Sequence, residues 1–286
     1  MAANAKYTPA ATRDSFEDQP TSSYTQPPPS YRDNPSSASH ANPNAILDYG
    51  SAPRSEDDNV PDDFKFGGSV AEATLPIRMA FIRKVYTILT CQIILTAALS
   101  AVSFWNASYK NWIQSNSWMM WTSLFGAIGF MLLTFWKRKS YPTNMIFLTG
   151  FTALEAYSIS VITSFYDSRI VLQALILTGA IFIFLTIFAC QSKYDFTSWA
   201  PYLFGSLWIL IIFGLMASFF PMGSTMELVY GAAAALIFSG YILVDTQLVM
   251  RHYHVEEEIA AAISLYLDVI NLFLAILRIL NSQQNN

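Results

Sequence analysis

Residues 228–280 read LVYGAAAALIFSGYILVDTQLVMRHYHVEEEIAAAISLYLDVINLFLAILRIL. Two apolar blocks flank a short polar linker that begins at Arg251. A membrane-spanning helix needs about 20 predominantly apolar residues, and each block reaches this length. Because the linker is short, the two helices are expected to form an antiparallel hairpin. This stretch therefore predicts an α-helical membrane protein.

Further apolar blocks precede this hairpin from Phe81 onward, and they complete an all-α membrane protein of seven transmembrane helices. We expect the spans near residues 85–104, 118–136, 145–165, 170–189, 202–220, 228–250 and 259–280. The last block contains Asp268 and Asn271, so a re-entrant helix is the alternative to a seventh full span.

The composition agrees with lipid as the solvent of this chain. Of its 286 residues, 53% are hydrophobic and only 13% are charged, and the mean hydropathy is +0.34. Soluble domains carry roughly a quarter charged residues. The net charge of −4 gives no support for nucleic-acid binding. Two cysteines, both within apolar stretches, exclude a disulfide framework and a cysteine-rich zinc site.

Three regions follow from this pattern. Residues 1–75 are rich in Pro, Ser, Asn and Asp, and are expected to form a disordered cytosolic tail. Residues 76–282 form the membrane domain, and residues 283–286 a short polar C-terminus. The tail contains Pro28, Pro29 and Tyr31 in a PPxY pattern, which a WW domain, such as that of a ubiquitin ligase, can bind. A chance match in a Pro-rich tail is the alternative.

The positive charges predict the orientation of the spans. Cytosolic loops carry an excess of Lys and Arg. With the N-terminus in the cytosol, that side holds Arg78, Arg83, Lys84, Lys137, Arg138, Lys139, Lys193 and Arg251. The opposite side then holds only Lys110 and Arg169, and also Arg278 if the seventh helix crosses. A short loop that follows the fourth span contains Asp195 and Thr197, either of which could cap the fifth helix.

Three acids lie inside the predicted spans, where ionisable groups are costly and usually functional. They are Glu155, Asp245 and Asp268. In a hairpin whose turn centres near His254, Asp245 and Asp268 differ in depth by only about 7–8 Å. Two carboxyls this close would share a proton and titrate as a pair. They could also bind calcium weakly. The alternative is two separate buried acids, each hydrogen-bonded to a hydroxyl.

Two further residues are candidates for the same site. Arg138 lies at the cytosolic end of the second span, from which it could pair with Asp245 as a latch, or act only as an interfacial anchor. Glu155 is expected to face the interior near hydroxyls such as that of Ser158, where it lines a pathway or bridges helices.

Enzymatic activity is not expected from this sequence. It contains no catalytic triad, P-loop or dinucleotide fingerprint. Intramembrane aspartyl proteases use two aspartates on adjacent helices, one of them in a Gly-x-Gly-Asp motif. No glycine adjoins Asp245 or Asp268, so an intramembrane aspartyl protease is disfavoured. No cofactor is expected.

Four segments resemble the Bax-inhibitor-motif family, and in particular its lifeguard-like branch of the fungal type. They are residues 238–247 (FSGYILVDTQ), 264–273 (SLYLDVINLF), 193–197 (KYDFT) and 151–158 (FTALEAYS). The resemblance covers residues 76–282. It implies seven helices with the last one central between two three-helix layers. It also implies a pH-sensitive calcium leak across an internal membrane.

The resemblance further assigns roles to particular residues. It implies that Asp245 and Asp268 form the acid sensor, that Arg138 latches Asp245, and that Glu257 is a possible gating acid at the entry to the last helix. The sequence departs from the family pattern at Val244, where a tyrosine is common. The second span also lacks the acid found in bacterial relatives.

Two functions are therefore carried forward. The first is a pH-sensitive calcium leak channel, most simply in the endoplasmic reticulum membrane, with the vacuole or Golgi as alternatives. The second is a non-conducting membrane scaffold that regulates cell death through protein partners.

Overall fold

The computed structural model describes residues 69–71, 73–137, 140–219 and 223–284, which belong to one compact unit. Tail residues Pro28, Pro29 and Tyr31 lie outside the described residues, as does Arg138. The described part is helical apart from one isolated antiparallel bridge between Ser69 and His254. Its elements are α2 (Leu75–Trp105), α3 (Ala107–Ser115), α4 (Trp118–Trp136), α5 (Thr143–Thr163), α6 (Ser168–Gln191), η2 (Phe196–Trp199), α7 (Ala200–Phe219), α8 (Ser224–Arg251) and α9 (Glu258–Gln284).

Seven of the helices in the described part are long and apolar enough to cross a membrane, which confirms the predicted fold class. The last of these, α9, is continuous over 27 residues. At a rise of about 1.5 Å per residue it extends about 40 Å, more than the hydrocarbon core of a bilayer. A single helix of this length can cross a membrane, as a full seventh span requires.

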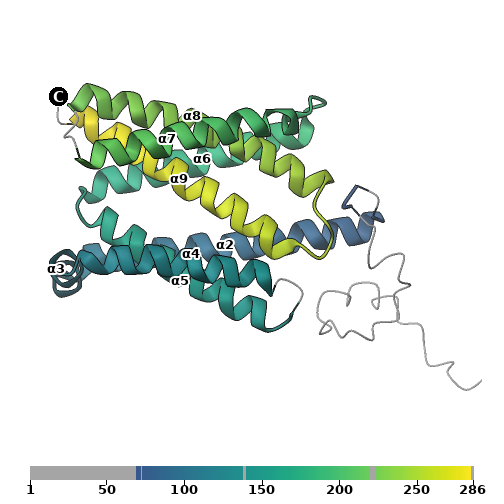
Figure 1. The fold of residues 1–286 in the computed structure, drawn as a ribbon, viewed down its shortest axis with the longest axis horizontal. Helices are drawn as coiled ribbons and strands as arrows, with labels where there is room; N and C mark the ends of the chain where they lie inside the picture. Colours follow the sequence, from purple (N-terminus) through teal and green to yellow (C-terminus); the bar gives the residue numbers. More distant parts are fainter. Residues whose placement is uncertain (1–68, 72, 138–139, 220–222, 285–286) are drawn as a thin grey trace, which may run out of the picture. The chain divides into compact units, whose positions relative to one another are not determined.

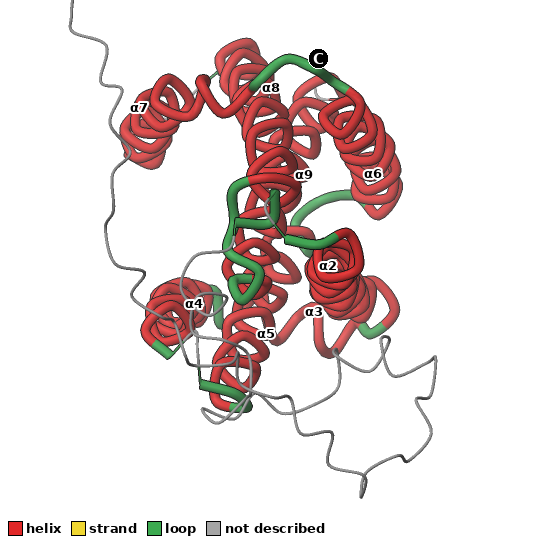
Figure 2. Tube along the Cα trace, turned by 90° about the vertical axis from the view of Figure 1, so that its right-hand side faces the viewer, coloured by secondary structure: helices red, strands yellow, loops and turns green. Residues whose placement is uncertain are grey.

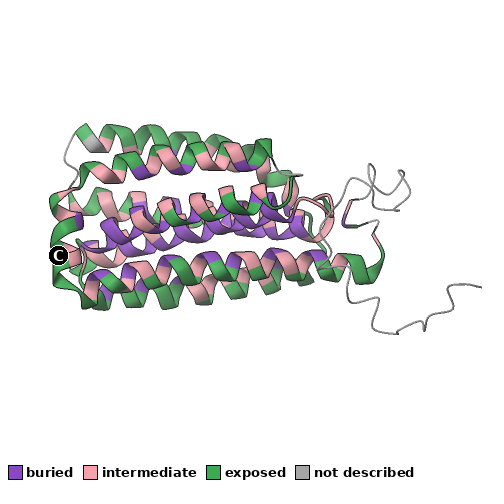
Figure 3. Cartoon of the chain, turned by 90° about the horizontal axis from the view of Figure 1, so that it is seen from below, coloured by how far each residue is buried: buried purple, intermediate pink, exposed green. Residues whose placement is uncertain are grey.

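The helices form two layers with α9 between them (Figure 1). One layer holds α6, α7 and α8, and the other holds α2, α4 and α5. The last helix packs against α8, α2 and α6, which agrees with its place among them in the turned view (Figure 2). Its apolar window is 78% buried, against 6–44% for the other spans. The buried residues accordingly concentrate along α9, while the outer helices expose their apolar faces (Figure 3).

The helices differ from the sequence prediction at two places. Helix α2 begins at Leu75, ahead of the span predicted at 85–104. The residues before 85 include charged side chains, which lower the apolar signal without preventing a helix, and Pro76 suits the first turn. The short helix α3 was not predicted. Its first turn is capped by Asn106, whose side chain accepts a hydrogen bond from the Tyr109 N–H at 3.1 Å.

Small and hydroxyl-bearing residues allow the helices to approach closely, as is common in membranes. A Cβ added to Gly231 of α8 would lie 2.9 Å from Ile279 Cγ1 and 3.2 Å from the Ala275 carbonyl oxygen of α9. Asp195 caps the short helix η2, which directly precedes α7, by accepting from the Thr197 N–H at 3.0 Å; the sequence had placed this cap on the fifth long helix itself. The α8–α9 contact therefore rests partly on the absence of a side chain at Gly231.

Candidate functional site

Two aspartates meet at the centre of the bundle. Asp245 lies about two turns before the end of α8, and Asp268 about 15 Å along α9 from its first residue. Their side chains are hydrogen-bonded to each other. An ionised carboxylate offers only acceptors, so this contact requires a proton on at least one of the two groups. The structure thus brings together the two acids that the hairpin geometry placed at similar depth.

Asp268 is the more deeply buried member of the pair. Asp268 is only 6% exposed, whereas Asp245 is half-buried. Apart from the contact with Asp245, Asp268 Oδ2 is buried and has no hydrogen-bond partner among the described residues. Leaving a buried carboxyl oxygen without a partner costs free energy. The arrangement therefore offers an acceptor atom to a proton or cation in the middle of the membrane.

The α8–α9 loop covers the pair at one end. The Tyr253 hydroxyl lies 3.2 Å from Ser264 Oγ. Burial raises the pKa of Tyr253 to about 12, and the negative charges of Asp245 and Asp268 act in the same direction. The phenol consequently keeps its proton at physiological pH and lies within electrostatic range of both acids.

A short segment before α2 holds this loop in place. The Val70 N–H donates to the Tyr253 carbonyl at 2.9 Å, and the Ala71 N–H donates to the Arg251 carbonyl at 3.2 Å. The Val70 side chain is fully buried in the main apolar core. Residues 69–71 therefore act as a strap that fixes the cover over the aspartates.

Two glutamates stand at the entry to α9. Glu258 Oε1 lies 3.6 Å from Lys84 Nζ, and the Glu258 side chain is 8% exposed, so this ion pair ties α2 to α9. Glu257 is half-buried and lies within electrostatic range of Tyr253. The structure places Glu257 beside the cover of the acid pair.

Glu155 lies beside a different face of α9. Its electrostatic neighbour there is Tyr266, which stands about 200° around the helix from Asp268. No hydrogen bond joins Glu155 to Ser158 in the described structure. Instead, Ser158 Oγ lies 2.7 Å from Ser123 Oγ, because Ser158 faces α4. The structure therefore separates Glu155 from the paired aspartates.

Around Tyr266 the three helices α2, α5 and α9 share a buried polar seam. The Tyr266 hydroxyl and Thr96 Oγ1 are 2.8 Å apart. One turn earlier along α2, Gln92 Nε2 donates to Thr152 Oγ1 at 3.0 Å. Sequence reasoning did not select these residues, although a glutamine within an apolar span is a recognisable signal for interhelical hydrogen bonding.

The remaining predicted site features are only partly visible. Arg138 lies outside the described residues, so its pairing with Asp245 stays a prediction. Within the described ranges, no group of three or more His, Cys, Asp or Glu side chains could hold a metal ion. Within these ranges the acid pair therefore supplies two carboxyl groups and no larger cluster of such side chains.

These features define a class of protein: a polytopic α-helical membrane protein with a hydrogen-bonded carboxyl pair buried in its central hairpin. Within that class, the chain belongs to the Bax inhibitor family. The family model described as "Inhibitor of apoptosis-promoting Bax1" matches residues 78–285. The resemblance seen in the sequence motifs is thereby confirmed.

Proteins from a virus, a mammal and a yeast share this similarity. The "Golgi anti-apoptotic protein" of vaccinia virus is 42% identical over 222 residues, covering 78% of this chain and 93% of the viral protein. "Protein lifeguard 4" of Mus musculus is 40% identical over 224 residues, covering 78% of this chain and 94% of the mouse protein. "Bax inhibitor 1" of Schizosaccharomyces pombe is 39% identical over 225 residues, covering 79% of this chain and 85% of the yeast protein.

Proposed function

We propose that this protein is a pH-sensitive calcium leak channel of an internal membrane that modulates calcium homeostasis and cell-death or stress responses. The observation that carries the proposal is the hydrogen-bonded pair of Asp245 and Asp268, about 15 Å inside α9 and so near mid-membrane. Ionisable groups at this depth usually mark ion or proton pathways.

The chemistry of the pair supports coupling between protons and calcium. Calcium is a hard cation that prefers oxygen ligands such as those of Asp245 and Asp268. A cation bound between the carboxyls would displace the proton that they share, since both species need the same oxygens. Acidification therefore weakens calcium binding at the pair.

Calcium flux into dye-loaded vesicles tests this proposal. In wild-type protein the flux should differ between about pH 6, 7 and 8, whereas in a variant carrying Asp245→Asn and Asp268→Asn the ratio of fluxes should fall to about one. Asparagine keeps the size of the side chain and removes its titration. An unchanged pH profile in folded variant protein would overturn the sensor role of the pair.

Asp195→Asn is the matched control for these variants. Asp195 is an exposed acid far along the chain from the pair, and asparagine can also cap a helix. Hydrogen bonds from Thr197 hold the pKa of Asp195 below its usual range, so its charge stays constant over the pH range of the assay. The control variant should keep the wild-type pH profile.

Cell-death regulation is the second part of the proposal. In the alternative function, the protein regulates cell death as a non-conducting membrane scaffold that acts through protein partners. The viral relative's name describes an anti-apoptotic Golgi protein. We place this chain in the endoplasmic reticulum membrane, with the Golgi or vacuole as the competing sites. Cell-death regulators are the proposed partners, and Pro28, Pro29 and Tyr31 are proposed to engage a WW-domain ubiquitin ligase.

Removing the tail separates the two functions. A chain that starts near residue 64 keeps every described helix and the strap, and loses Pro28, Pro29 and Tyr31. If the protein is a channel, this chain should conduct calcium like the full chain and fail to bind an isolated WW domain. If the full chain also conducts no calcium while its tail is needed for protection against cell death, the scaffold function is favoured.

A further inference from the structure

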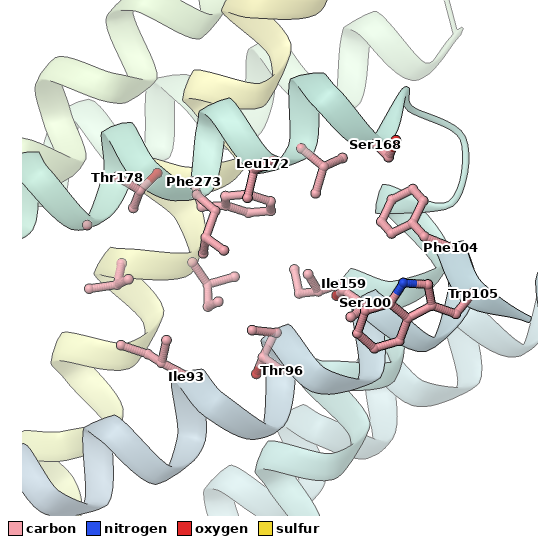
Figure 4. A pocket seen from close by; sticks show the side chains of 17 residues that line it. Ile93, Thr96, Ser100, Phe104, Trp105, Ile159, Ser168, Leu172, Thr178 and Phe273 are labelled. Carbon is pink, nitrogen blue, oxygen red and sulfur yellow. The ribbon is translucent and has the colours of Figure 1, made fainter.

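A groove opens between α2 and α6, with α9 as its floor (Figure 4). It has a volume of about 260 Å³. Its walls are almost entirely apolar, and small residues such as Ala97 and Gly179 create the space. A Cβ added to Gly179 would meet no atom within 4 Å. The groove is separate from the hydrogen-bonded aspartates, neither of which lines it.

The groove runs along the membrane normal from one surface toward the middle of the bilayer. It begins at Trp105 and Ser168, the end of α2 and the start of α6, and reaches Ile93 and Gly179. At about 1.5 Å per residue these segments extend about 16–18 Å. Half of the hydrocarbon core of a bilayer is about 15 Å thick. The groove therefore matches the length of one acyl chain in one leaflet.

The outer wall of the groove faces lipid, so a bilayer component can enter from the side. Leu172 and Leu175 line it and are 57% and 42% exposed. Both lie on α6, one of the spans least buried within the protein.

Positive charge stands at the surface end of the groove. Lys110 Nζ lies 6.0 Å from the ring centroid of Phe104, a residue that lines the groove. Arg169 is exposed and directly follows Ser168 at the groove mouth. Asp167 is the acidic residue next to this positive charge at the groove mouth. One of its carboxylate oxygens already accepts a hydrogen bond from the Arg169 backbone N–H at 2.7 Å. Basic pockets between transmembrane helices bind anionic lipid headgroups.

One polar atom in the wall lacks a partner. Ser100 lines the groove about 7 Å below Trp105, and its residue is 7% exposed. Ser100 Oγ makes no hydrogen bond among the described residues. An unpaired hydroxyl in an apolar medium costs free energy. The ester carbonyl of a phospholipid lies just below its headgroup and would supply the missing acceptor once the Ser100 side chain rotates its buried hydroxyl toward the groove.

We infer that this groove binds one glycerophospholipid of the leaflet that meets Trp105. One acyl chain lies against α9, the ester region lies near Ser100, and the phosphate lies near Lys110 and Arg169. A sterol would fill the apolar part but has no anionic group for these cations. The floor residues Val269 and Ile270 directly follow Asp268, so the lipid also packs against α9, the helix that carries Asp268.

Native mass spectrometry of the full-length protein tests this site after reconstitution with phosphatidylcholine, phosphatidylserine and cholesterol. Wild-type protein released from detergent should retain one phospholipid. Gly179→Leu fills the groove and should lower the retained fraction at least about five-fold. Gly205→Leu is the matched control, because Gly205 lies on α7, outside the groove, and a Cβ there also meets nothing within 4 Å.

Charge reversal tests the headgroup contact without changing a buried position. Lys110→Glu should lower phospholipid retention about five-fold or more, since each cation near the surface contributes to binding an anionic group. The control is Lys193→Glu, which reverses the charge of an exposed lysine on the loop after α6 and should leave phospholipid retention unchanged. Retention of cholesterol alone, equal retention by Gly179→Leu and Gly205→Leu, or no retained lipid in wild type would overturn the inference.

Discussion

At the scale of single residues, Tyr253 links the loop to the acid pair. Its hydroxyl contacts Ser264, and its carbonyl accepts the Val70 N–H. Both contacts depend on a loop conformation that periodicity does not encode, so the sequence did not single out Tyr253. The two aspartates were predictable for the opposite reason. An acid inside an apolar block stands out, and helix rise alone fixes its depth.

The titration of Tyr253 makes the stability of the protein depend on alkaline pH. Burial raises the pKa of Tyr253 to about 12, whereas an unfolded tyrosine titrates near about 10. The contribution of the buried phenol to the free energy of unfolding is complete below about pH 10 and is lost as pH rises through about 12. Between these two pH values only the folded state retains the proton. Thermal unfolding in detergent across this range should show a smaller alkaline loss for Tyr253→Phe than for wild type.

The control for this measurement is Tyr194→Phe, which removes another tyrosine from a loop. Tyr194 is exposed, and its hydroxyl only accepts a hydrogen bond from Trp199 Nε1 at 3.3 Å. The Tyr194→Phe variant should follow the wild-type alkaline profile. If Tyr253→Phe does so as well, burial of the Tyr253 phenol contributes nothing to alkaline stability.

At the scale of elements, the α8–α9 hairpin is the contact that positions the acid pair. Its two helices touch where Gly231 lies against Ala275 and Ile279, far along the bundle from the aspartates. The sequence predicted the hairpin from linker length. It could not predict which face of α8 meets α9, because both helices are apolar on nearly all sides and periodicity carries little information there.

Gly231→Val should therefore destabilise the protein. The added side chain would clash with the Ala275 carbonyl oxygen, a backbone atom that cannot rotate away. Overpacking of this kind costs about 1–3 kcal/mol. The variant should lower the thermal unfolding midpoint in detergent, while Gly129→Val, placed where a Cβ meets nothing within 4 Å, should change it little. Equal midpoints for the two variants would show that α8 and α9 are not tightly apposed at Gly231.

At the scale of the whole molecule, seven spans and a central last helix followed from apolar block lengths and from the family resemblance. Block lengths alone do not place α9 at the centre. The structure supplies the physical reason: α9 is flanked by helices of both layers, and so carries buried residues on nearly all of its surface. The polar seam of Gln92, Thr96 and Tyr266 was not predicted, since it needs three helices brought together.

The two ends of the bundle also differ in charge, and this asymmetry predicts the orientation of the molecule. The end that carries Lys84 and the α8–α9 loop is the predicted cytosolic side, because cytosolic loops carry the excess of Lys and Arg. Helix α3 lies at the other end of α2 and should face the lumen. Lys193 and Ser115 are exposed positions on the two sides.

Single cysteines at these positions, Lys193→Cys and Ser115→Cys, measure the orientation directly. They are placed in a chain whose exposed native cysteines, Cys91 and Cys190, are replaced by alanine. In sealed endomembrane vesicles with the cytosolic face outward, a membrane-impermeant maleimide should label Lys193→Cys several-fold faster than Ser115→Cys. Detergent should make the two rates similar. The reverse pattern would place Glu257 and the α8–α9 loop on the luminal side and would contradict the predicted orientation.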